Sequence, residues 1–555
     1  MKVFKLLVLN LLFLSFCQIA YAQNEGKSNS LGGVFSGSLE ANGNFFIADS
    51  AIGAVGTPQY DRQLYGADAW MDLRYSNWGF DFGVRFDMFN NSILLNPLGS
   101  YSDQGIGRWY VRKKIDKLGI SAGYLYDQIG SGVIFRAYEQ RPLAIDNALY
   151  GVRLTYDLLE DWQIKAFSGK QKQQFEYYGA TIRGLSVDGF VSGGEEANWS
   201  IAPGAGVVTR TIDDETMEGV VNQIATYNVQ DSTGLKYNSY AMTLYNTLTV
   251  GKFSWYFEGA YKTEDVMTNP LLERLDRQGT STIPGKIILE TGNVLYSSFS
   301  FSTSGFGATL ELKRTENFNF RTDPFVVLNR GIINFLPPMT RVNTYRLTSR
   351  YAPATQEFGE KAIQLDLSYA ASRKLRFNVN LSNITTLEDD VLYREAYSEV
   401  TYKHKRKWTL IGGLQYQQYN QEVFEEKPDV GILTAVIPFV EWQYKLSRKK
   451  SIRFELQYMD VAEKKDFGSW AFALAEFSVA PHWTVTISDM YNISPTKRTD
   501  NEDIHYPRFD VFYTHKSNRF SLSYVKQVEG IVCSGGICRL EPAFSGVKMS
   551  VNSTF

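Results

Sequence analysis

The most restrictive feature of this sequence is a strict alternation of apolar and polar residues that recurs along most of its length. In the last such segment Val547, Met549 and Val551 alternate with Lys548 and Ser550. Successive side chains of a β-strand point to opposite faces, so this segment is predicted to be a strand with one apolar and one polar face. The pattern suits the wall of a water-filled membrane barrel or a sheet of a soluble protein.

Strand length favours the barrel. Many alternating segments run about 10 to 13 residues, the length that a tilted strand needs to cross a bilayer, whereas strands of soluble sheets have a mode of about 5 to 6. Aromatic residues make up 14% of the chain, with 34 Tyr and 36 Phe, which fits the aromatic girdles of membrane barrels. Alternating segments include residues 80–87, 363–369, 375–382, 452–458, 483–488 and 520–524.

Short and long connections take turns between these segments. The short ones include residues 76–78, 159–161, 372–374, 405–407, 447–450 and 480–482. The long polar ones are residues 50–62, 90–105, 127–147, 383–393, 420–430, 460–466 and 492–506. Short periplasmic turns and long outer loops are typical of an all-β transmembrane antiparallel barrel, here with roughly 24 strands and a range of about 22 to 26. Residues 184–198 and 323–360 blur the count.

The N-terminus has the layout of a cleaved export signal, residues 1–22. Lys2 and Lys5 precede an apolar stretch, and small residues around Tyr21 lead to cleavage before Gln23. A lipid-modified Cys17 is disfavoured because Phe16 is too bulky for the preceding position. The absence of a later apolar run of helical length, together with export, predicts a location in the Gram-negative outer membrane.

The remaining chain is expected to form one domain. Residues 23–32 are interpreted as a short periplasmic segment and residues 33–555 as a single barrel, with neither a globular N-terminal plug nor a peptidoglycan-binding tail. The terminal aromatic residue, Phe555, is interpreted as the barrel's C-terminal signal.

Residues 127–147 are too apolar for an ordinary outer loop, because exposed apolar patches of this kind are unfavourable in water. We expect them to fold into the barrel and narrow it, with a packed extracellular cap as the alternative. The candidate residues for this constriction are Arg136, Tyr138, Glu139, Arg141 and Asp146. A second apolar stretch punctuated by prolines, residues 324–338, adds Arg330 to the candidates.

Three further features bear on the loops and the interior. Asp213 or Asp214 caps a predicted helix whose apolar stripe extends from Met217 to Ile224, expected at the barrel mouth. Cys533 and Cys538 flank a Ser-Gly-Gly turn and are expected to form a disulfide, with free thiols or a metal as the alternatives. Inward-facing charges, such as Asp72, Asp87, Arg85 and Lys262, nearly balance in sign, which predicts weak ion selectivity.

Several function classes are disfavoured. A net charge of -2 gives no basic surface for nucleic acid. The chain has four His and none of the nucleophile, phosphate-loop or metal-ligand motifs of common enzymes, so no catalysis, cofactor or metal is expected.

The sequence resembles a family of outer-membrane β-barrels from Bacteroidota that are about as long as this chain and have no established activity. The matching stretches are residues 132–139, residues 146–147 and residues 530–539. The resemblance spans the mature chain and implies the barrel fold and the outer-membrane location.

The function is therefore argued from barrel size. An empty pore of about 24 strands would make the membrane leaky, so its lumen is expected to be filled by inward-folded loops, with a separate protein as the alternative. Our first hypothesis is a porin-like channel for polar solutes that these loops narrow. The alternative is a non-conducting scaffold that docks a surface or periplasmic lipoprotein, or another partner of a secretion machinery. In both hypotheses the barrel contacts outer-membrane lipid.

Overall fold

The computed structural model describes residues 32–194, 198–425, 430–461, 467–493, 504–534 and 537–555. The expected signal peptide, residues 1–22, and residues 23–31 of the expected periplasmic segment lie outside the described residues. Among the described residues, no helix has both the length and the apolar character needed to cross a lipid bilayer.

The described residues form one closed antiparallel barrel of 24 strands, which confirms the predicted fold. Its first half consists of β1 (Val34–Phe46), β2 (Tyr65–Asn77), β3 (Phe80–Ser92), β4 (Tyr101–Ile115), β5 (Leu118–Leu125), β10 (Leu149–Leu159), β11 (Trp162–Gln173), β12 (Glu176–Gly189), β14 (Trp199–Thr211), β15 (Asn238–Val250), β16 (Phe253–Leu275) and β17 (Thr282–Thr303). Its second half consists of β18 (Phe306–Glu316), β19 (Gly359–Tyr369), β20 (Leu375–Thr385), β21 (Val391–His404), β22 (Trp408–Asn420), β23 (Ile432–Lys445), β24 (Lys450–Val461), β25 (Trp470–Val479), β26 (Trp483–Asn492), β27 (Ile504–His515), β28 (Asn518–Gln527) and β31 (Phe544–Thr554).

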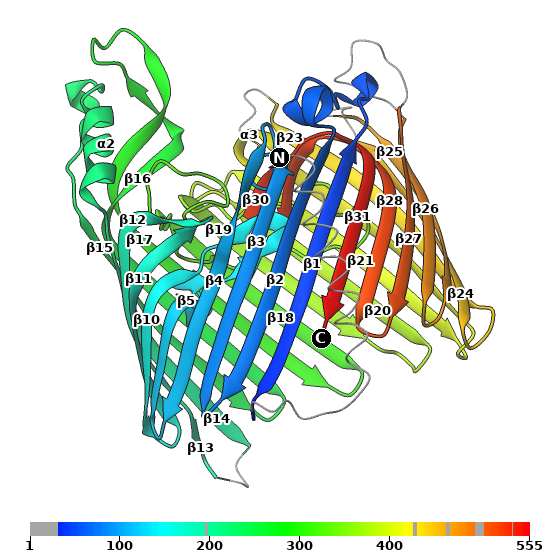
Figure 1. Cartoon of the computed structure of the whole chain (residues 1–555), viewed down its shortest axis with the longest axis horizontal. Helices are drawn as coiled ribbons and strands as arrows, with labels where there is room; N and C mark the ends of the chain where they lie inside the picture. Colours follow the sequence, from blue (N-terminus) through cyan, green and yellow to red (C-terminus); the bar gives the residue numbers. More distant parts are fainter. Residues whose placement is uncertain (1–31, 195–197, 426–429, 462–466, 494–503, 535–536) are drawn as a thin grey trace.

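The barrel closes where the last strand meets the first, and Figure 1 shows β1 and β31 side by side. At this seam Gly37 N–H donates to the Phe555 carbonyl at 2.8 Å, and Phe555 N–H donates back at 3.0 Å. A Cβ atom on Gly37 would lie 2.5 Å from the Phe555 ring, so a glycine is needed for the ring to lie against β1. The C-terminal aromatic residue therefore contributes directly to closure of the barrel.

The two ends of the barrel differ in their connections. At the end near the C-terminus the hairpins are short, as at residues 78–79, 116–117, 251–252 and 516–517. At the opposite end, the upper end in Figure 1, most connections are longer. The two stretches that blurred the strand count are resolved. Residues 184–198 contain the end of β12 and the short β13 (Val191–Ser192), while residues 317–358 form one long connection without a barrel strand.

Exposure alternates along the wall as the sequence predicted. On β16, for example, Phe257 is 40% exposed and its neighbour Glu258 is 0% exposed. Large apolar side chains such as Leu244 and Ile487 face outward, and polar ones such as Gln415 face inward. Seven of the ten tryptophans lie within a few residues of the connections at the end with the short turns, which suits the boundary between lipid and water. These are Trp78, Trp162, Trp199, Trp255, Trp408, Trp442 and Trp483.

One hairpin rises above the rest of the ring. β16 and β17 have 23 and 22 residues, and α2 (Asp214–Ile224) lies beside their extension at the upper left of Figure 1. Asp213 accepts a hydrogen bond from Thr216 N–H, which confirms the predicted N-cap. Met217 and Val220 of α2 pack against Val266 and Ile287 of the hairpin.

The remaining elements are short. They are β6 (Asp127–Ile129), β7 (Phe135–Ala137), β8 (Glu139–Gln140), β9 (Ile145–Asp146), β29 (Gly530–Ser534), β30 (Ile537–Glu541), α3 (Gln421–Phe424), η1 (Ser50–Ile52), η2 (Gln59–Gln63), η3 (Arg141–Leu143) and η4 (Val229–Asp231).

Candidate functional site

The connection between β5 and β10, residues 126–148, is called here the first inner loop. It consists of two small hairpins, β6–β7 and β8–β9, with η3 inside the second. Gly130 and Gly132 adopt positive φ values of 56° and 100° at the tip of the first hairpin. A Cβ atom on Gly130 would lie 2.7 Å from Glu258 Oε1, so the glycine allows this tip to approach the wall closely.

Apolar side chains of the first inner loop pack on the inward face of the wall. Val133 and Ile134 are 0% exposed, and the Phe135 ring stacks on Phe167 of β11 with ring centroids 4.4 Å apart. Further wall residues in the same cluster are Ile182, Val208, Ala241, Ala260 and Val294. Burial of each large apolar side chain is worth about 1.5–3 kcal/mol. The loop therefore has a substantial energetic reason to lie against the interior.

Arg85 on β3 is the centre of a charged cluster that joins the wall to this loop. Its guanidinium donates to Asp87 at 2.6 Å, to Glu139 at 2.6 Å and to Asp146 at 2.9 Å, and its side chain is 1% exposed. Lys172 of β11 forms a second ion pair with Asp146. Buried charges are tolerated when they are paired, so this cluster is satisfied only with the loop in place.

Asp146 is held as a carboxylate by these partners. Burial raises its pKa, but Lys172 and Arg85 together lower it more, and hydrogen bonds from Lys172 and Tyr126 act in the same direction. The resulting pKa is about 2. The ion pairs of Asp146 are consequently present throughout the neutral and mildly acidic range.

Arg141 extends the cluster to the first two strands. Its guanidinium donates to Glu40 of β1 at 2.6 Å, to Asp72 of β2 at 3.3 Å and to Glu139 at 3.0 Å. The loop thus contacts inward-facing residues on β1, β2, β3, β11 and β16, which lie on different parts of the ring. A segment with all of these contacts must extend across the interior.

Residues 317–358, called here the second inner loop, join the first one. Phe335 N–H donates to the Gly132 carbonyl at 2.9 Å, and Arg136 N–H donates to the Ile333 carbonyl at 2.8 Å. The side chain of Asn147 also donates to the Ile332 carbonyl at 3.0 Å. The two loops therefore form one hydrogen-bonded unit.

A buried cluster on the wall anchors the start of the second inner loop. Arg210 of β14 and Lys262 of β16 both pair with Asp265. Arg210 also donates to the Arg321 carbonyl at 2.8 Å, and Lys262 donates to the Asn319 carbonyl at 2.5 Å. Asp265 balances part of the charge of the two cations, and the loop carbonyls accept further hydrogen bonds from them.

The rest of the second inner loop reaches the opposite wall. Asn343 donates to Glu395 of β21 at 3.2 Å, and Leu347 N–H donates to Gln457 of β24 at 2.8 Å. The Tyr345 ring lies 4.4 Å from the Phe439 ring of β23, centroid to centroid. Together the two loops contact inward-facing residues around most of the ring.

A cavity of about 660 Å³ lies at the tip of the first inner loop, towards the end with the short turns. Its lining carries both charge signs, from Lys165 and Asp188, together with hydroxyl and amide groups. Three tyrosines, Tyr245, Tyr256 and Tyr296, contribute aromatic faces. The cavity is suited to polar solutes of either charge.

The sequence-predicted constriction residues separate into three groups. Glu139, Arg141 and Asp146 lie together in the Arg85 cluster. Arg136 lies between the loops, 4.6 Å over the Tyr138 ring and 4.2 Å over the Phe335 ring. Arg330 is exposed at the edge of the second inner loop, with a hydrogen bond to the Leu95 carbonyl at 3.4 Å.

The two cysteines lie on the β29–β30 hairpin of the connection before the last strand. Cys533 and Cys538 are direct register partners. Their side chains lie outside the described residues, and the disulfide stays a prediction. Arg539 of the same hairpin donates to the Pro142 carbonyl at 2.8 Å, which links this connection to the first inner loop.

Sequence reasoning missed several wall partners of the inner loops. Lys172, Arg210, Asp265 and Glu258 were not among the residues predicted to form the constriction. Glu258 accepts hydrogen bonds from Ser131 and Tyr256. Their inward position follows from the alternation, but their pairing with particular loop residues does not.

The family model of DUF6029, a family of unknown function, matches residues 1–555. The chain belongs to the DUF6029 family. This membership is consistent with the resemblance noted above, and the phylum stays a prediction. No curated protein sequence matches the chain.

Solved structures resemble this DUF6029 chain at low sequence identity. The P pilus usher (PapC) translocation pore has a TM-score of 0.44 and 9% identity, over 94% of this chain and 99% of that one. The ferric enterobactin receptor PfeA from Pseudomonas aeruginosa has a TM-score of 0.42 and 8% identity, over 94% and 81%. The ferric-catecholate import receptor Fiu from E. coli K12 has a TM-score of 0.38 and 11% identity, over 93% and 81%.

Proposed function

We propose that this protein is a channel of the Gram-negative outer membrane, narrowed by its two inner loops, through which polar solutes pass. The outward apolar face and the tryptophans near the short turns support a membrane location. The expected signal peptide supports export. Neither catalysis nor a cofactor is part of this proposal.

The size of the barrel indicates that its interior must be narrowed. Barrels of about 16 to 18 strands already leave an aqueous channel, and 22-stranded transporters carry a plug. A wider barrel with an empty interior would pass solutes without discrimination. In this protein the inner loops occupy the position in which a plug would act.

The Arg85 cluster is the observation that carries the proposal. It attaches the first inner loop to the wall through ion pairs, and charged groups can be rehydrated when a loop moves aside. The apolar packing of Phe135 and its neighbours opposes this movement, which nevertheless costs less than release of a loop held by apolar contacts alone. We therefore propose that the loop can leave the wall reversibly, and that the mixed charges of the cavity below it give weak ion selectivity.

Single-channel recording in planar bilayers tests this function. Leu125 and Leu149 are register partners on β5 and β10, so a short Gly-Ser turn can replace residues 126–148 without altering the wall. We expect this variant to conduct in larger steps than the wild type, with little preference for K⁺ over Cl⁻. Equal conductance of the two proteins would contradict the narrowing role.

The β16–β17 extension favours a second candidate function, a scaffold that docks a lipoprotein. It rises above the ring together with α2, and apolar side chains are exposed here, among them Leu271 of β16 at 50% and Val229 of the adjacent η4 at 89%. Purification in mild detergent from native membranes, with and without residues 268–286, tests this candidate. A lipoprotein that co-purifies only with the full-length chain, in the absence of conductance, would favour the scaffold.

A further inference from the structure

The outward wall changes from apolar to charged at one level across neighbouring strands, where two cations are each paired with an exposed carboxylate. On β18 the outward residues Leu310 and Leu312 are followed by Arg314, and on β19 Ile363 is preceded by Lys361. Arg314 and Lys361 are register partners, two residues from the ends of their strands at the long connections. This is the level at which an apolar membrane belt gives way to lipid head groups.

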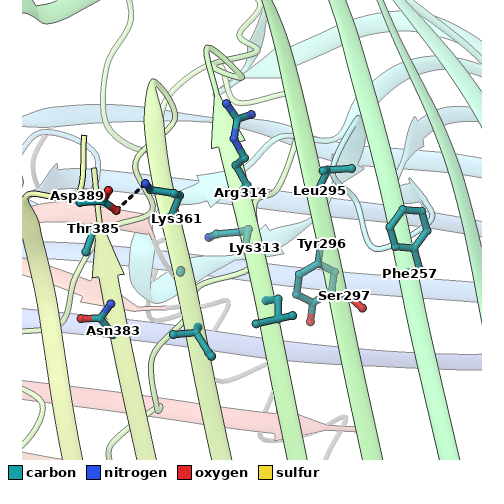
Figure 2. A pocket seen from close by; sticks show the side chains of 13 residues that line it. Phe257, Leu295, Tyr296, Ser297, Lys313, Arg314, Lys361, Asn383, Thr385 and Asp389 are labelled. Atoms are coloured by element: carbon teal, nitrogen blue, oxygen red, sulfur yellow. Dashed lines mark hydrogen bonds and ion pairs between the residues drawn. The ribbon is translucent and has the colours of Figure 1, made fainter. Parts of the chain in front are cut away.

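A cleft of about 510 Å³ opens on this part of the wall. Figure 2 shows Leu295 and Phe257 on one side of Arg314, and Lys361 with Asp389 on the other. Leu312 and Ile363 belong to the same lining and are 38% and 45% exposed. The cleft thus combines an apolar floor with two cations at one rim.

Both cations are held in place but retain donor capacity. Arg314 donates to Asn293 at 2.6 Å and to Glu316 at 2.8 Å, while Lys361 pairs with Asp389 at 2.6 Å. A guanidinium has five N–H donors and an ammonium has three. The Asp389 side chain is 79% exposed and the Arg314–Glu316 pair is also exposed to solvent, and ion pairs between exposed side chains are weak. A phosphate group can therefore bind these cations at small cost.

We propose that this cleft binds a phosphate-bearing lipid of the outer leaflet. The inference rests on the proposed outer-membrane location, with the long connections outside. In a membrane the outward wall is covered by lipid, and the position of the two cations selects lipids that carry phosphate at head-group level. Acyl chains lie along Leu295, Leu312 and Ile363, and the phosphate accepts charge-assisted hydrogen bonds from Arg314 and Lys361.

Native mass spectrometry of the detergent-solubilised full-length protein, titrated with diphosphorylated lipid A, tests this proposal. We expect the double variant Arg314→Gln/Lys361→Gln to bind this lipid about tenfold or more weakly, because two charge-assisted hydrogen bonds to the phosphate are lost. Arg183→Gln is the matched control, since Arg183 faces outward on β12 but does not line the cleft. The swap Arg314→Lys/Lys361→Arg should restore most of the binding.

Three outcomes would overturn the proposal. In the first, the double variant and Arg183→Gln bind the lipid with equal affinity. In the second, dephosphorylated lipid A binds the wild type as tightly as the phosphorylated form does. In the third, millimolar inorganic phosphate displaces the lipid completely. The last outcome would indicate a site for free phosphate. Conductance of the double variant is expected to equal that of the wild type, so failure of lipid binding is distinguishable from failure of the channel function.

Discussion

Arg85 Nη2 donates to Asp146 Oδ2 at 2.9 Å, although the two residues lie 61 positions apart in the chain. Arg85 belongs to the wall and Asp146 to the first inner loop, so this pair joins the wall to the loop that we propose can move. The two buried wall cations Arg85 and Lys172 share one wall carboxylate, Asp87, so full compensation of their charge needs the loop carboxylates. The following predictions concern this attachment and the loops around it.

Arg85→Gln is expected to release the first inner loop. Removal of one partner from a buried charged cluster typically costs about 3–5 kcal/mol, which corresponds to a shift of the docking equilibrium by about a hundredfold to several thousandfold. Planar-bilayer recordings should show larger or longer openings than the wild type. Arg74→Gln is a suitable control, because Arg74 lies on β2 and is exposed. The same openings in both variants would argue against a specific role for Arg85.

A double-mutant cycle separates the pair from general damage to the barrel. Asp146→Asn alone should also favour open states. The double variant Arg85→Gln/Asp146→Asn is expected to open less than the sum of the two single effects, because each single change leaves an uncompensated buried charge. Strict additivity of the two free-energy changes would mean that the residues act independently.

Phe135→Ala is expected to weaken the apolar attachment of the same loop. Loss of a buried aromatic side chain costs about 3–5 kcal/mol, and Phe135 stacks on Phe167 in the interior. Trypsin should then cleave after Arg136 faster than in the wild type, as measured by mass spectrometry. Phe306→Ala, which removes an outward-facing ring, should leave this cleavage rate unchanged.

The attachment is expected to withstand moderate acid. The folded pKa of Asp146 is about 2, below the ordinary value of 3.8, so its stabilising contribution is complete above about pH 4 and is lost as the pH falls through about 2. Conductance should therefore be constant from pH 7 to pH 4 and rise only near pH 2. A wild-type opening transition near pH 6 that disappears in Asp146→Asn would contradict this assignment.

Cys533 and Cys538 are expected to be oxidised in the protein from native membranes. Their direct pairing in an antiparallel hairpin places the Cα atoms at about 4.5–5.5 Å, within the range that a disulfide spans. Alkylation without reductant, followed by peptide mass spectrometry, should leave both residues unmodified. Alkylation of both residues under these conditions would show free thiols.

The barrel wall was predictable from the sequence because its signal is local. Alternation within one strand, as from Phe80 to Asp87, indicates which side chains face outward. This inference does not require the identity of the neighbouring strands. The helix at Met217 was predictable for the same reason, since its cap and stripe lie within a dozen residues. The apolar character of residues 127–147 predicted that this connection would not extend into water.

The pairing inside the barrel was not predictable from local signals. Ser131 and Glu258 lie 127 positions apart, and no periodic pattern connects an irregular loop to a distant strand. The second inner loop has neither helix nor strand over residues 336–351. The residues that contact β21 and β24 therefore follow no periodic pattern in the sequence. The height of the β16–β17 hairpin was also missed, because Pro270 and several charged residues interrupt its alternation.

The most direct test of the account is to lock the first inner loop to the wall. Ser131 Oγ contacts the end of the Glu258 side chain, so the thiols of the variant Ser131→Cys/Glu258→Cys lie close enough for a short bis-maleimide linker that contains a reducible disulfide. We predict that the cross-linked variant shows no large openings and that reduction of the linker restores them, while Ser131→Cys alone is insensitive to the same treatment. Equal single-channel conductance before and after reduction of a verified cross-link would contradict gating by this loop.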